Sequence, residues 1–379
     1  MKEGWEAKRL VNICKIQYGY PFDSKQFCDD SKYPQLIRIR DVSRGYSETY
    51  YSGEIPEGYY IDKGDYLIGM DGEFNIAAWN SERALLNQRV CKITANEEAF
   101  DRFLYYNLRI ILKQIEDETP FVTVKHLSAK RLNAVTINLP PLSEQQHIVE
   151  ELDLLSSIIE KKKAQLNELD NLAQSLFYEM FGHLYETAFP IKVLIDICEF
   201  IKDGTHQTPT YTDDKVNGVK FLSAKDVVSG YINWENVKLI PFELHQELHK
   251  RIAPQRNDLL LCKNGTTGIC AIVETDEIFD IYVSLALLRP KKPFCPKYLL
   301  YAINNPQTKR QFDESLKGIG VPNLHLGEIK KTKIIFPPLE LQQQFATKIE
   351  AIEHQKGHIK QSIKEVETLF NSRMDYYFN

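Results

Sequence analysis

Two long stretches of the chain repeat apolar residues at alternating steps of four and three. The first series runs from Ile148 to Met180, and Lys162 is its polar break. The second runs from Phe345 to Tyr377, at an offset of 197 residues (345 − 148), with Lys356 and Arg373 as polar breaks. A period near 3.5 residues held over this length, between charged flanks, predicts two coiled-coil helices rather than two helices that cover a globular core.

The same eight-residue pattern opens both helices. Leu139-Pro140-Pro141-Leu142-Ser143-Glu144-Gln145-Gln146 precedes the first, and Phe336-Pro337-Pro338-Leu339-Glu340-Leu341-Gln342-Gln343 precedes the second. Proline is tolerated in the first turn of a helix and keeps the preceding residue extended, so each pair marks a helix start. Gly182 provides a stop for the first helix. The chain therefore consists of one unit used twice.

Strand-like sequence precedes each helix, and its motifs also recur. Leu10-Val11-Asn12-Ile13-Cys14 is mirrored by Leu194-Ile195-Asp196-Ile197-Cys198, and Asp41–Tyr46 by Asp226–Tyr231. We predict an α+β protein in which two mixed α/β domains are separated by a long antiparallel two-helix coiled coil, with an internal pseudo-two-fold repeat. The predicted segments are domain 1 (1–139), spacer helix 1 (140–182), domain 2 (183–336) and spacer helix 2 (337–379).

Composition limits the functional classes. The 379 residues contain 47 Lys and Arg against 52 Asp and Glu, a net charge of −5, so binding to nucleic acid would need basic residues clustered on one face. No apolar run approaches the length of a membrane span, and the first residues lack the apolar core of a signal peptide. The seven scattered cysteines favour reduced thiols, without a disulfide framework or a zinc site. We therefore expect a cytoplasmic location.

The duplicated Pro-Pro-Leu-x-x-Gln-Gln pattern resembles the specificity subunit of a type I restriction-modification system. The stretches Asp203-Gly204-Thr205-His206-Gln207-Thr208-Pro209 and Gly218–Val227 resemble segments of the target-recognition domains in such subunits. The resemblance covers essentially the whole chain. It departs from the repeat at Leu341, which stands where the first copy has Glu144, and in residues 18–32, which do not match the Asp-Gly-Thr-His stretch.

This resemblance implies a function and partners. Each domain would read one half of a bipartite target in double-stranded DNA. The helices would set the spacer and dock DNA adenine methyltransferase subunits, expected to be two, which associate with the restriction and translocase subunits. If the helix seams pair antiparallel, residues 143–181 form a rod of roughly 58 Å, which spans about 17 base pairs at about 3.4 Å per pair.

No signature of catalysis is found in the sequence. It lacks an [ND]PP[YF] methyltransferase motif, a Gly-rich cofactor-binding turn, a Walker A sequence and a convincing nuclease constellation of carboxylates and lysine. We expect no catalytic residue, metal or cofactor on this chain, and S-adenosylmethionine, ATP and Mg on the partner subunits. Alternatives are a stand-alone nuclease or methyltransferase, the specificity domain of another multisubunit restriction, methylation or phage-defence system, and a coiled-coil scaffold.

Candidate DNA-binding residues follow from the chemistry of base and phosphate contacts. Arg pairs with guanine, Asn and Gln pair with adenine, and phosphates accept bonds from Lys, Arg, hydroxyls and backbone amides. We expect Arg38, Arg40 and Arg44 to alternate on a strand and its turn, with Lys225 at the matching place in the second half. The other candidates are Asn87, Gln88, Arg89, Thr123, Lys125, His126, Gly204, Thr205, His206, Gln207, Lys263, Asn264, Thr266, Thr267 and Asn323.

Three further patterns need an interpretation. A core alone would not require the paired glutamines at the helix starts, so we expect subunit contacts there, with helix capping as the alternative. The contact residues would be Pro140, Pro141, Leu142, Gln145, Gln146, Pro337, Pro338, Leu339, Gln342 and Gln343. Gly265-Thr266-Thr267-Gly268 is predicted to be a turn rather than a phosphate loop. His245 and His249 share a helical face without an HExxH motif, which indicates a solvated helix rather than a metal site.

Overall fold

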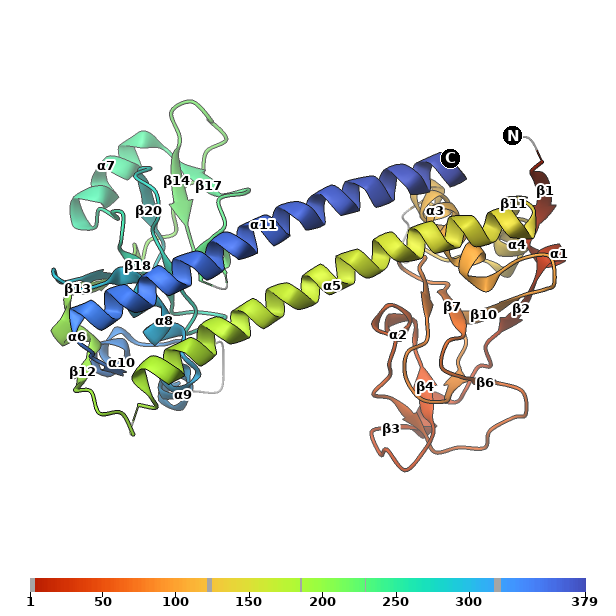
Figure 1. Cartoon of the computed structure of the whole chain (residues 1–379), viewed down its shortest axis with the longest axis horizontal. Helices are drawn as coiled ribbons and strands as arrows, with labels where there is room; N and C mark the ends of the chain where they lie inside the picture. Colours follow the sequence, from red (N-terminus) through yellow and green to blue (C-terminus); the bar gives the residue numbers. More distant parts are fainter. Residues whose placement is uncertain (1–3, 121–124, 185, 229, 317–321) are drawn as a thin grey trace. The chain divides into compact units, whose positions relative to one another are not determined.

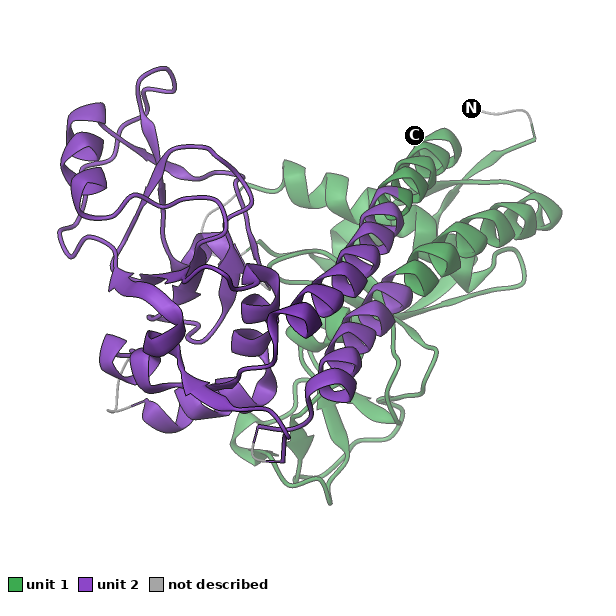
Figure 2. Cartoon of the chain, turned by 60° about the vertical axis from the view of Figure 1, so that its left-hand side comes forward, with its two compact units in different colours: residues 1–162, 362–379 green, residues 163–361 purple. Residues whose placement is uncertain are grey.

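The computed structural model describes residues 4–120, 125–184, 186–228, 230–316 and 322–379. The chain divides into two compact units, residues 1–162 with 362–379 and residues 163–361, which are distinguished by colour in Figure 2. Each unit contains one globular region and parts of both long helices. Among the described residues, no helix is both long enough and apolar enough to cross a lipid bilayer.

The globular region of unit 1 contains two main sheets. One is antiparallel with the strand order β2-β10-β7-β8, and the other has the order β3-β5-β4-β9-β6, in which β4 and β9 are parallel. A third pair joins β1 to β11. The elements are β1 (Glu6–Arg9), α1 (Leu10–Ile13), β2 (Cys14–Tyr18), the 3₁₀ helix η1 (Ser24–Gln26), β3 (Phe27–Cys28), β4 (Gln35–Ile37), α2 (Ile39–Arg44), β5 (Tyr50–Tyr51), β6 (Tyr60–Ile61), β7 (Tyr66–Gly69), β8 (Ile76–Ala78), β9 (Ala84–Leu86), β10 (Val90–Ala95), α3 (Asp101–Glu118), α4 (Ala129–Asn133) and β11 (Thr136–Leu139).

Unit 2 repeats this plan with additions. Its four-stranded sheet has the order β13-β21-β18-β19, and β14 pairs with β20 in parallel. The elements are β12 (Ile191–Val193), α6 (Leu194–Ile197), β13 (Cys198–Asp203), β14 (Val219–Leu222), the 3₁₀ helix η2 (Ala224–Asp226), β15 (Val227–Val228), β16 (Tyr231–Ile232), β17 (Lys238–Ile240), α7 (Phe242–Arg251), β18 (Leu259–Cys262), β19 (Cys270–Ile272), β20 (Phe279–Ile281), β21 (Leu285–Pro290), α8 (Pro296–Asn304), α9 (Pro306–Ser315), α10 (Leu326–Lys331) and β22 (Lys333–Ile335).

The two predicted long helices are α5 (Leu142–Phe181) and α11 (Leu339–Phe378), drawn in Figure 1. Every position of both predicted apolar series is buried or half-buried. In unit 1 the core includes Ile148 and Leu152 from α5 together with Phe370 and Met374 from α11. In unit 2 it includes Phe177 of α5 and Phe345 of α11. The early part of each helix thus packs against the late part of the other, and the pairing is antiparallel as predicted.

Ion pairs occupy two polar breaks of the apolar series. In unit 1 Arg373 donates to Glu151 at 2.8 Å. In unit 2 the Lys356 ammonium lies 2.7 Å from Asp170. Because the side chains of Lys356 and Arg373 are only partly exposed, an unpaired charge at either place would be costly to desolvate.

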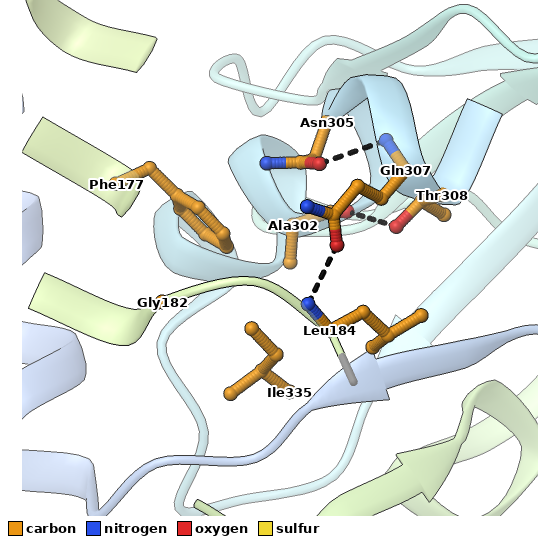
Figure 3. A pocket seen from close by; sticks show the side chains of 8 residues that line it. All are labelled: Phe177, Gly182, Leu184, Ala302, Asn305, Gln307, Thr308 and Ile335. Carbon is orange, nitrogen blue, oxygen red and sulfur yellow. Dashed lines mark hydrogen bonds between the residues drawn. The ribbon is translucent and has the colours of Figure 1, made fainter. Parts of the chain in front are cut away.

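Helix α5 ends at Phe181, and Gly182 follows with φ +73°, the left-handed conformation that glycine adopts easily. The chain beyond it is held by the start of α9, as Figure 3 shows. The side chain of Gln307 accepts a bond of 2.6 Å from the Leu184 backbone, and the Asn305 side chain caps α9 by accepting from the Gln307 backbone at 2.9 Å. The predicted helix stop at Gly182 is therefore confirmed.

Candidate nucleic-acid interface

In unit 1, three segments meet at the end of strand β7, and two of them contain predicted DNA-binding residues. The Met70 backbone amide donates to the carbonyl oxygen of Arg89, the residue before β10, at 2.9 Å. The Gly72 backbone donates to Lys125 at 2.9 Å, and Leu127 donates back to Met70 at 2.7 Å. The turn after β7, the entry to β10 and the segment before α4 therefore form one continuous backbone frame.

Unit 2 contains the same frame at the end of strand β18. The Lys263 backbone donates to Ser284 at 2.8 Å, Gly265 donates to Pro322 at 3.3 Å, and Leu324 donates to Lys263 at 2.8 Å. These bonds match the bonds of unit 1 one by one. Lys263 thus stands where unit 1 has Met70, and Ser284 stands where unit 1 has Arg89.

A glycine closes each frame. Gly19 donates to Val90 at 3.0 Å and Gly204 to Leu285 at 3.2 Å. A Cβ atom at Gly19 would lie 2.0 Å from the Asn87 carbonyl oxygen, and one at Gly204 would lie 2.1 Å from that of Ile281. Because real Cβ contacts are never so short, only glycine fits at either position.

These glycines correct one feature of the sequence comparison. Residues 18–32 showed no match to the Asp-Gly-Thr-His stretch, yet Tyr18-Gly19-Tyr20 follows the same backbone path as Asp203-Gly204-Thr205. The segment of unit 1 pairs with the loop before β10 through the bridge Tyr20–Asn87. The segment of unit 2 pairs with the loop before β21 through the bridge Thr205–Tyr282. The main chain is shared, and the side chains are different.

In unit 2 the frame surrounds one carboxylate, Asp203. Its oxygens lie 2.9 Å from the Lys263 ammonium, 3.2 Å from Arg251 and 3.1 Å from a ring nitrogen of His206. Burial alone would raise the pKa of Asp203, but the bond and charge of Lys263, helped by His206, keep that pKa below its ordinary value. One buried carboxylate thus holds two permanent cations and a histidine at the site.

Unit 1 has a different set of charges on its frame. Asp71, in the turn after β7, accepts a bond from His126 and lies 3.6 Å from Arg89, which itself has φ +70°. Tyr18 stands at the position of Asp203, and its hydroxyl donates to Asn133 at 2.7 Å. Burial, with smaller contributions from Cys91 and Cys14, raises the pKa of Tyr18 to about 12, so the phenol stays neutral.

Among the basic residues after strand β4, Arg38 is the N-cap of helix α2, and Arg40 and Arg44 lie on that helix, which corrects the predicted strand. β4 ends at Ile37, because the buried Asp41 carboxylate accepts a 2.8 Å bond from the Arg38 backbone and starts α2. Arg38, Arg40 and Arg44 are all exposed there. In unit 2 the buried Asp226 accepts the equivalent 2.8 Å bond from Ser223, so Lys225 does match Arg40.

Exposure divides the predicted DNA-binding residues into groups. Thr123 lies outside the described residues. Asn87, Thr205, Lys263 and Thr267 are buried, so their side chains support the frame instead of facing a ligand, and Gly204 is buried and offers only its backbone. Lys125, Asn264 and Asn323 are half-buried, and Lys125 donates to the Glu116 carbonyl at 2.6 Å. The remaining candidates are exposed: Arg38, Arg40, Arg44, Gln88, Arg89, His126, His206, Gln207, Lys225 and Thr266.

The predicted contact residues at the helix starts also divide by exposure. Gln145 is fully buried; it accepts a bond of 3.0 Å from Phe100 and donates 2.9 Å bonds to Glu98 and Pro140. Gln342 is 1% exposed; it accepts from Cys295 at 3.1 Å and donates to Pro337 at 2.8 Å. These two buried glutamines are therefore not available for subunit contacts, and instead of capping the helix that they begin, they bond the backbone at the start of α3 or α8 and the first proline of their own turn.

The other residues of the helix starts differ in accessibility. Pro140 and Pro337 are buried, and Leu339 is half-buried. A surface patch remains on each copy, which we call the helix-start surface. It consists of Pro141, Leu142 and Gln146 in unit 1, and of Pro338 and Gln343 in unit 2.

One contributor to the site was not predicted from the sequence. Arg251 reaches Asp203 from the end of α7, and such a contact between residues far apart in the chain leaves no local pattern. The helix itself differs from its prediction, because His245 is 8% exposed and bonded to Asp280 rather than solvated. The predicted turn at residues 265–268 is present, with Gly265 at φ +77° and Gly268 at φ +81°.

The duplicated domain, the shared frame and the exposed basic and amide side chains around it define a two-domain recognition protein. The model of the type I restriction modification DNA specificity domain matches the chain twice, over residues 2–171 and 190–368. The chain belongs to this family. Membership supports DNA sequence recognition over the alternatives of a stand-alone enzyme and a structural scaffold.

Individual relatives agree with this assignment. The chain is 29% identical to the specificity subunit of the type I restriction enzyme EcoBI from Escherichia coli, over 92% of this chain and 79% of that one. It is 20% identical to the MjaVIII specificity subunit of Methanocaldococcus jannaschii, over 93% and 87%.

Two solved structures share the fold. A chain from a study of complex assembly and conformational transition of the type I R-M system aligns over 100% of this chain and 98% of its own, with a TM-score of 0.60 and 18% identity. The S subunit of the type I restriction-modification system from M. genitalium aligns over 98% and 95%, with a TM-score of 0.53 and 12% identity.

Proposed function

We propose that this chain is the specificity subunit of a type I restriction-modification complex, and that its two globular domains read different half-sites. The observation that carries this proposal is the shared backbone frame with different side chains. Tyr18, Met70 and Arg89 in unit 1 stand where unit 2 has Asp203, Lys263 and Ser284. Base edges are read by side chains, so the change from the exposed Arg89 to the half-buried Ser284 alters the recognition surface directly. The buried Met70 and Lys263 act on that surface only through the residues that they hold in place.

The charge on the frames supports contact with DNA despite the net charge of −5. In unit 2 the single carboxylate of Asp203 is outnumbered by the cations Lys263 and Arg251; Lys263 is buried against it, and the exposed candidates of this unit include Lys225 and His206. Local clusters of this sign attract phosphates even on an acidic protein.

Catalysis belongs to partner subunits in this proposal. The sequence motifs of methyl transfer and of ATP binding are absent from the chain, so S-adenosylmethionine, ATP and Mg would bind elsewhere in the complex. The purified chain alone is expected to transfer no methyl group and to leave DNA uncut.

The helix-start surfaces are the proposed docking points for DNA adenine methyltransferase subunits. Leu142 is 42% exposed, an apolar side chain beside Pro141 and Gln146 that its own unit leaves uncovered. The duplication supplies one such surface per copy, which supports two methyltransferase subunits. Restriction subunits would join through them.

The long helices would set the number of unread base pairs between the half-sites. Each contains 40 residues, or about 60 Å at about 1.5 Å per residue. That length corresponds to roughly 17 to 18 base pairs at about 3.4 Å per pair.

A domain exchange tests the proposal. Residues 183–336 are replaced by the second domain of another specificity subunit, and the chain is expressed with its methyltransferase in a host without other methylation. Sequencing of methylated bases should show one half-site changed, and the other half-site and the spacer kept. The matched control replaces residues 1–139 and should change the opposite half-site. Unchanged methylation, or a change of both half-sites from one exchange, would refute the assignment.

A further inference from the structure

Helix α7 and strand β20 of unit 2 bring two histidines and a carboxylate together. His245 and His249 lie four residues apart and therefore on one face of α7. Nδ1 of His245 is 2.7 Å from one oxygen of Asp280, and Nδ1 of His249 is 3.4 Å from the other. The ligand atoms of all three residues lie within 4.8 Å of one another, and among the described residues this is the one such group of histidine, cysteine or carboxylate side chains.

The burial of this group is unusual for a surface helix. Asp280 is 2% exposed and His245 is 8% exposed, whereas the His249 side chain is 31% exposed. A carboxylate at such depth needs a compensating cation, because burying an isolated charge is costly. His249, at the edge of the group, leaves an approach from solvent.

The geometry suits a small divalent transition-metal ion. Zinc binds histidine nitrogen and carboxylate oxygen at about 2.0–2.2 Å, so that tetrahedral ligand atoms lie about 3.3–3.5 Å apart. The 3.4 Å distance from His249 to Asp280 equals that separation, whereas the 2.7 Å distance from His245 is that of a hydrogen bond, which would open by about 0.6 Å when the ion replaces the shared proton. Two imidazoles and one carboxylate favour zinc over magnesium or calcium, which prefer oxygen ligands.

We propose that His245, His249 and Asp280 bind a divalent transition-metal ion of the zinc type, which fastens α7 to the edge of the sheet. A fourth position would be open to water. This site goes beyond the proposed function, and metal binding does not depend on whether the chain reads DNA.

The position of α7 gives the ion a structural consequence. The last residue of this helix, Arg251, donates to the Gly204 carbonyl at 3.2 Å and to Asp203. A metal that holds His245 and His249 would therefore hold Arg251 against the Asp203–Gly204 segment of the frame. In unit 1, residues 52–65, which lead into β7, contain no helix, and Leu85 stands at the position of Asp280. The ion would thus support one domain alone.

The test uses the full chain, free of any affinity tag and stripped of metal with a chelator. Zinc is titrated against a competing zinc indicator, with magnesium as the negative probe. The wild-type chain should bind one zinc ion per chain. His249→Ala and Asp280→Asn should each weaken binding by roughly tenfold or more, since even the loss of an outer-shell partner costs about 10–100-fold.

The chain offers a matched control in α11. His354 and His358 have the same spacing of four, with ring centroids 4.4 Å apart, and both are exposed. His354→Ala with His358→Ala should leave the tightly bound zinc in place. Cobalt loading should give visible bands without a sulfur charge-transfer band, which excludes the cysteines.

Two readouts keep the proposal falsifiable if Asp280→Asn fails to fold. His249 is partly exposed, so His249→Ala should retain the wild-type circular dichroism spectrum. Zinc should then raise the Tm of the wild type and of the His354/His358 variant, but not that of His249→Ala. Equal zinc affinity in His249→Ala and the wild type, or loss of binding only in the α11 variant, would overturn the proposal.

Discussion

The globular regions of units 1 and 2 differ in chemistry much more than in backbone. Matching hydrogen bonds hold the loops at the ends of β7 and β18, and a glycine without space for a Cβ closes both frames. On these frames unit 1 presents Tyr18, Asp71 and Arg89, whereas unit 2 presents Asp203 with two cations. The difference teaches that position and identity are controlled separately: backbone bonds set where a side chain stands, and the residue type sets what it can bind.

The largest effect is expected from removing the glycine of one frame. Gly204→Ala would place a methyl group 2.1 Å from a backbone oxygen that cannot move without breaking the sheet. We expect unit 2 to lose about 3 kcal/mol or more of unfolding free energy, at the upper end of overpacking costs. Denaturant unfolding, with the two units followed by separate probes, measures this loss.

Gly19→Ala should produce the corresponding result in the other domain, a loss of unfolding free energy confined to unit 1. Gly327→Ala is the matched control, because no atom lies within 4 Å of the added methyl group in α10. If both frame variants proved as stable as the control, the shared frame would not need its glycines.

A smaller effect is expected from the charges that distinguish unit 2. Lys263→Met installs the residue that unit 1 has at this position, and it leaves Asp203 with Arg251 and His206. We expect a loss of about 1–3 kcal/mol, less than for a fully isolated buried charge, since Arg251 remains. A double-mutant cycle with Asp203→Asn should give a coupling of about 0.5–3 kcal/mol, whereas a coupling near zero would contradict the ion cluster.

The same pair predicts a pH dependence. The pKa of Asp203 is lower in the folded chain than its ordinary value of 3.8. Its contribution to stability is therefore complete above pH 3.8 and is lost as the pH falls through the folded pKa. Unfolding curves of the wild type and Asp203→Asn should converge in acid.

The last comparison separates the two glutamines of each helix start, and its exposed variants give the smallest effect of all. Gln145→Leu leaves three backbone groups without a partner and Gln342→Leu leaves two. We expect losses of about 1–3 kcal/mol, larger for Gln145, from unsatisfied buried groups. Gln146→Leu and Gln343→Leu are the exposed controls and should change stability by less than about 0.5 kcal/mol.

Copurification with the methyltransferase completes this comparison. The exposed variants should weaken the interaction while the chain stays folded. The buried ones should act on it only as far as they unfold their unit. The reverse pattern would exclude the helix-start surface as a docking point.

Periodic features were predictable from the sequence, and contacts between distant residues were not. The antiparallel seam and the duplicated motifs follow from spacing, because a helix repeats its environment every three or four residues. The equivalence of Gly19 with Gly204 was missed because the flanking side chains differ while the backbone does not. Arg38, Ile39 and Arg40 alternate as in a strand, but the Asp41 carboxylate caps the chain into a helix.

Residues far apart in the chain explain the rest. Lys263 was expected at the surface, yet it is buried and donates to Asp203, which lies 60 residues earlier in the chain. Asp280 is 35 residues from His245, and nothing in the pattern of α7 indicates a buried acid beside it. Gln145 looked superfluous to a core because its partners are backbone groups, which have no sequence signature.

The ion pairs within the helix seam restrict how this molecule can evolve. A slip of one heptad would move a helix by about 10.5 Å and separate Lys356 from Asp170 and Arg373 from Glu151. A duplication in one helix alone would therefore leave charged side chains without their partners among apolar ones, at a cost in stability. We therefore expect changes in the length of the helix pair to arise as paired insertions, one in each helix. Single insertions should be tolerated only in the loops of the domains.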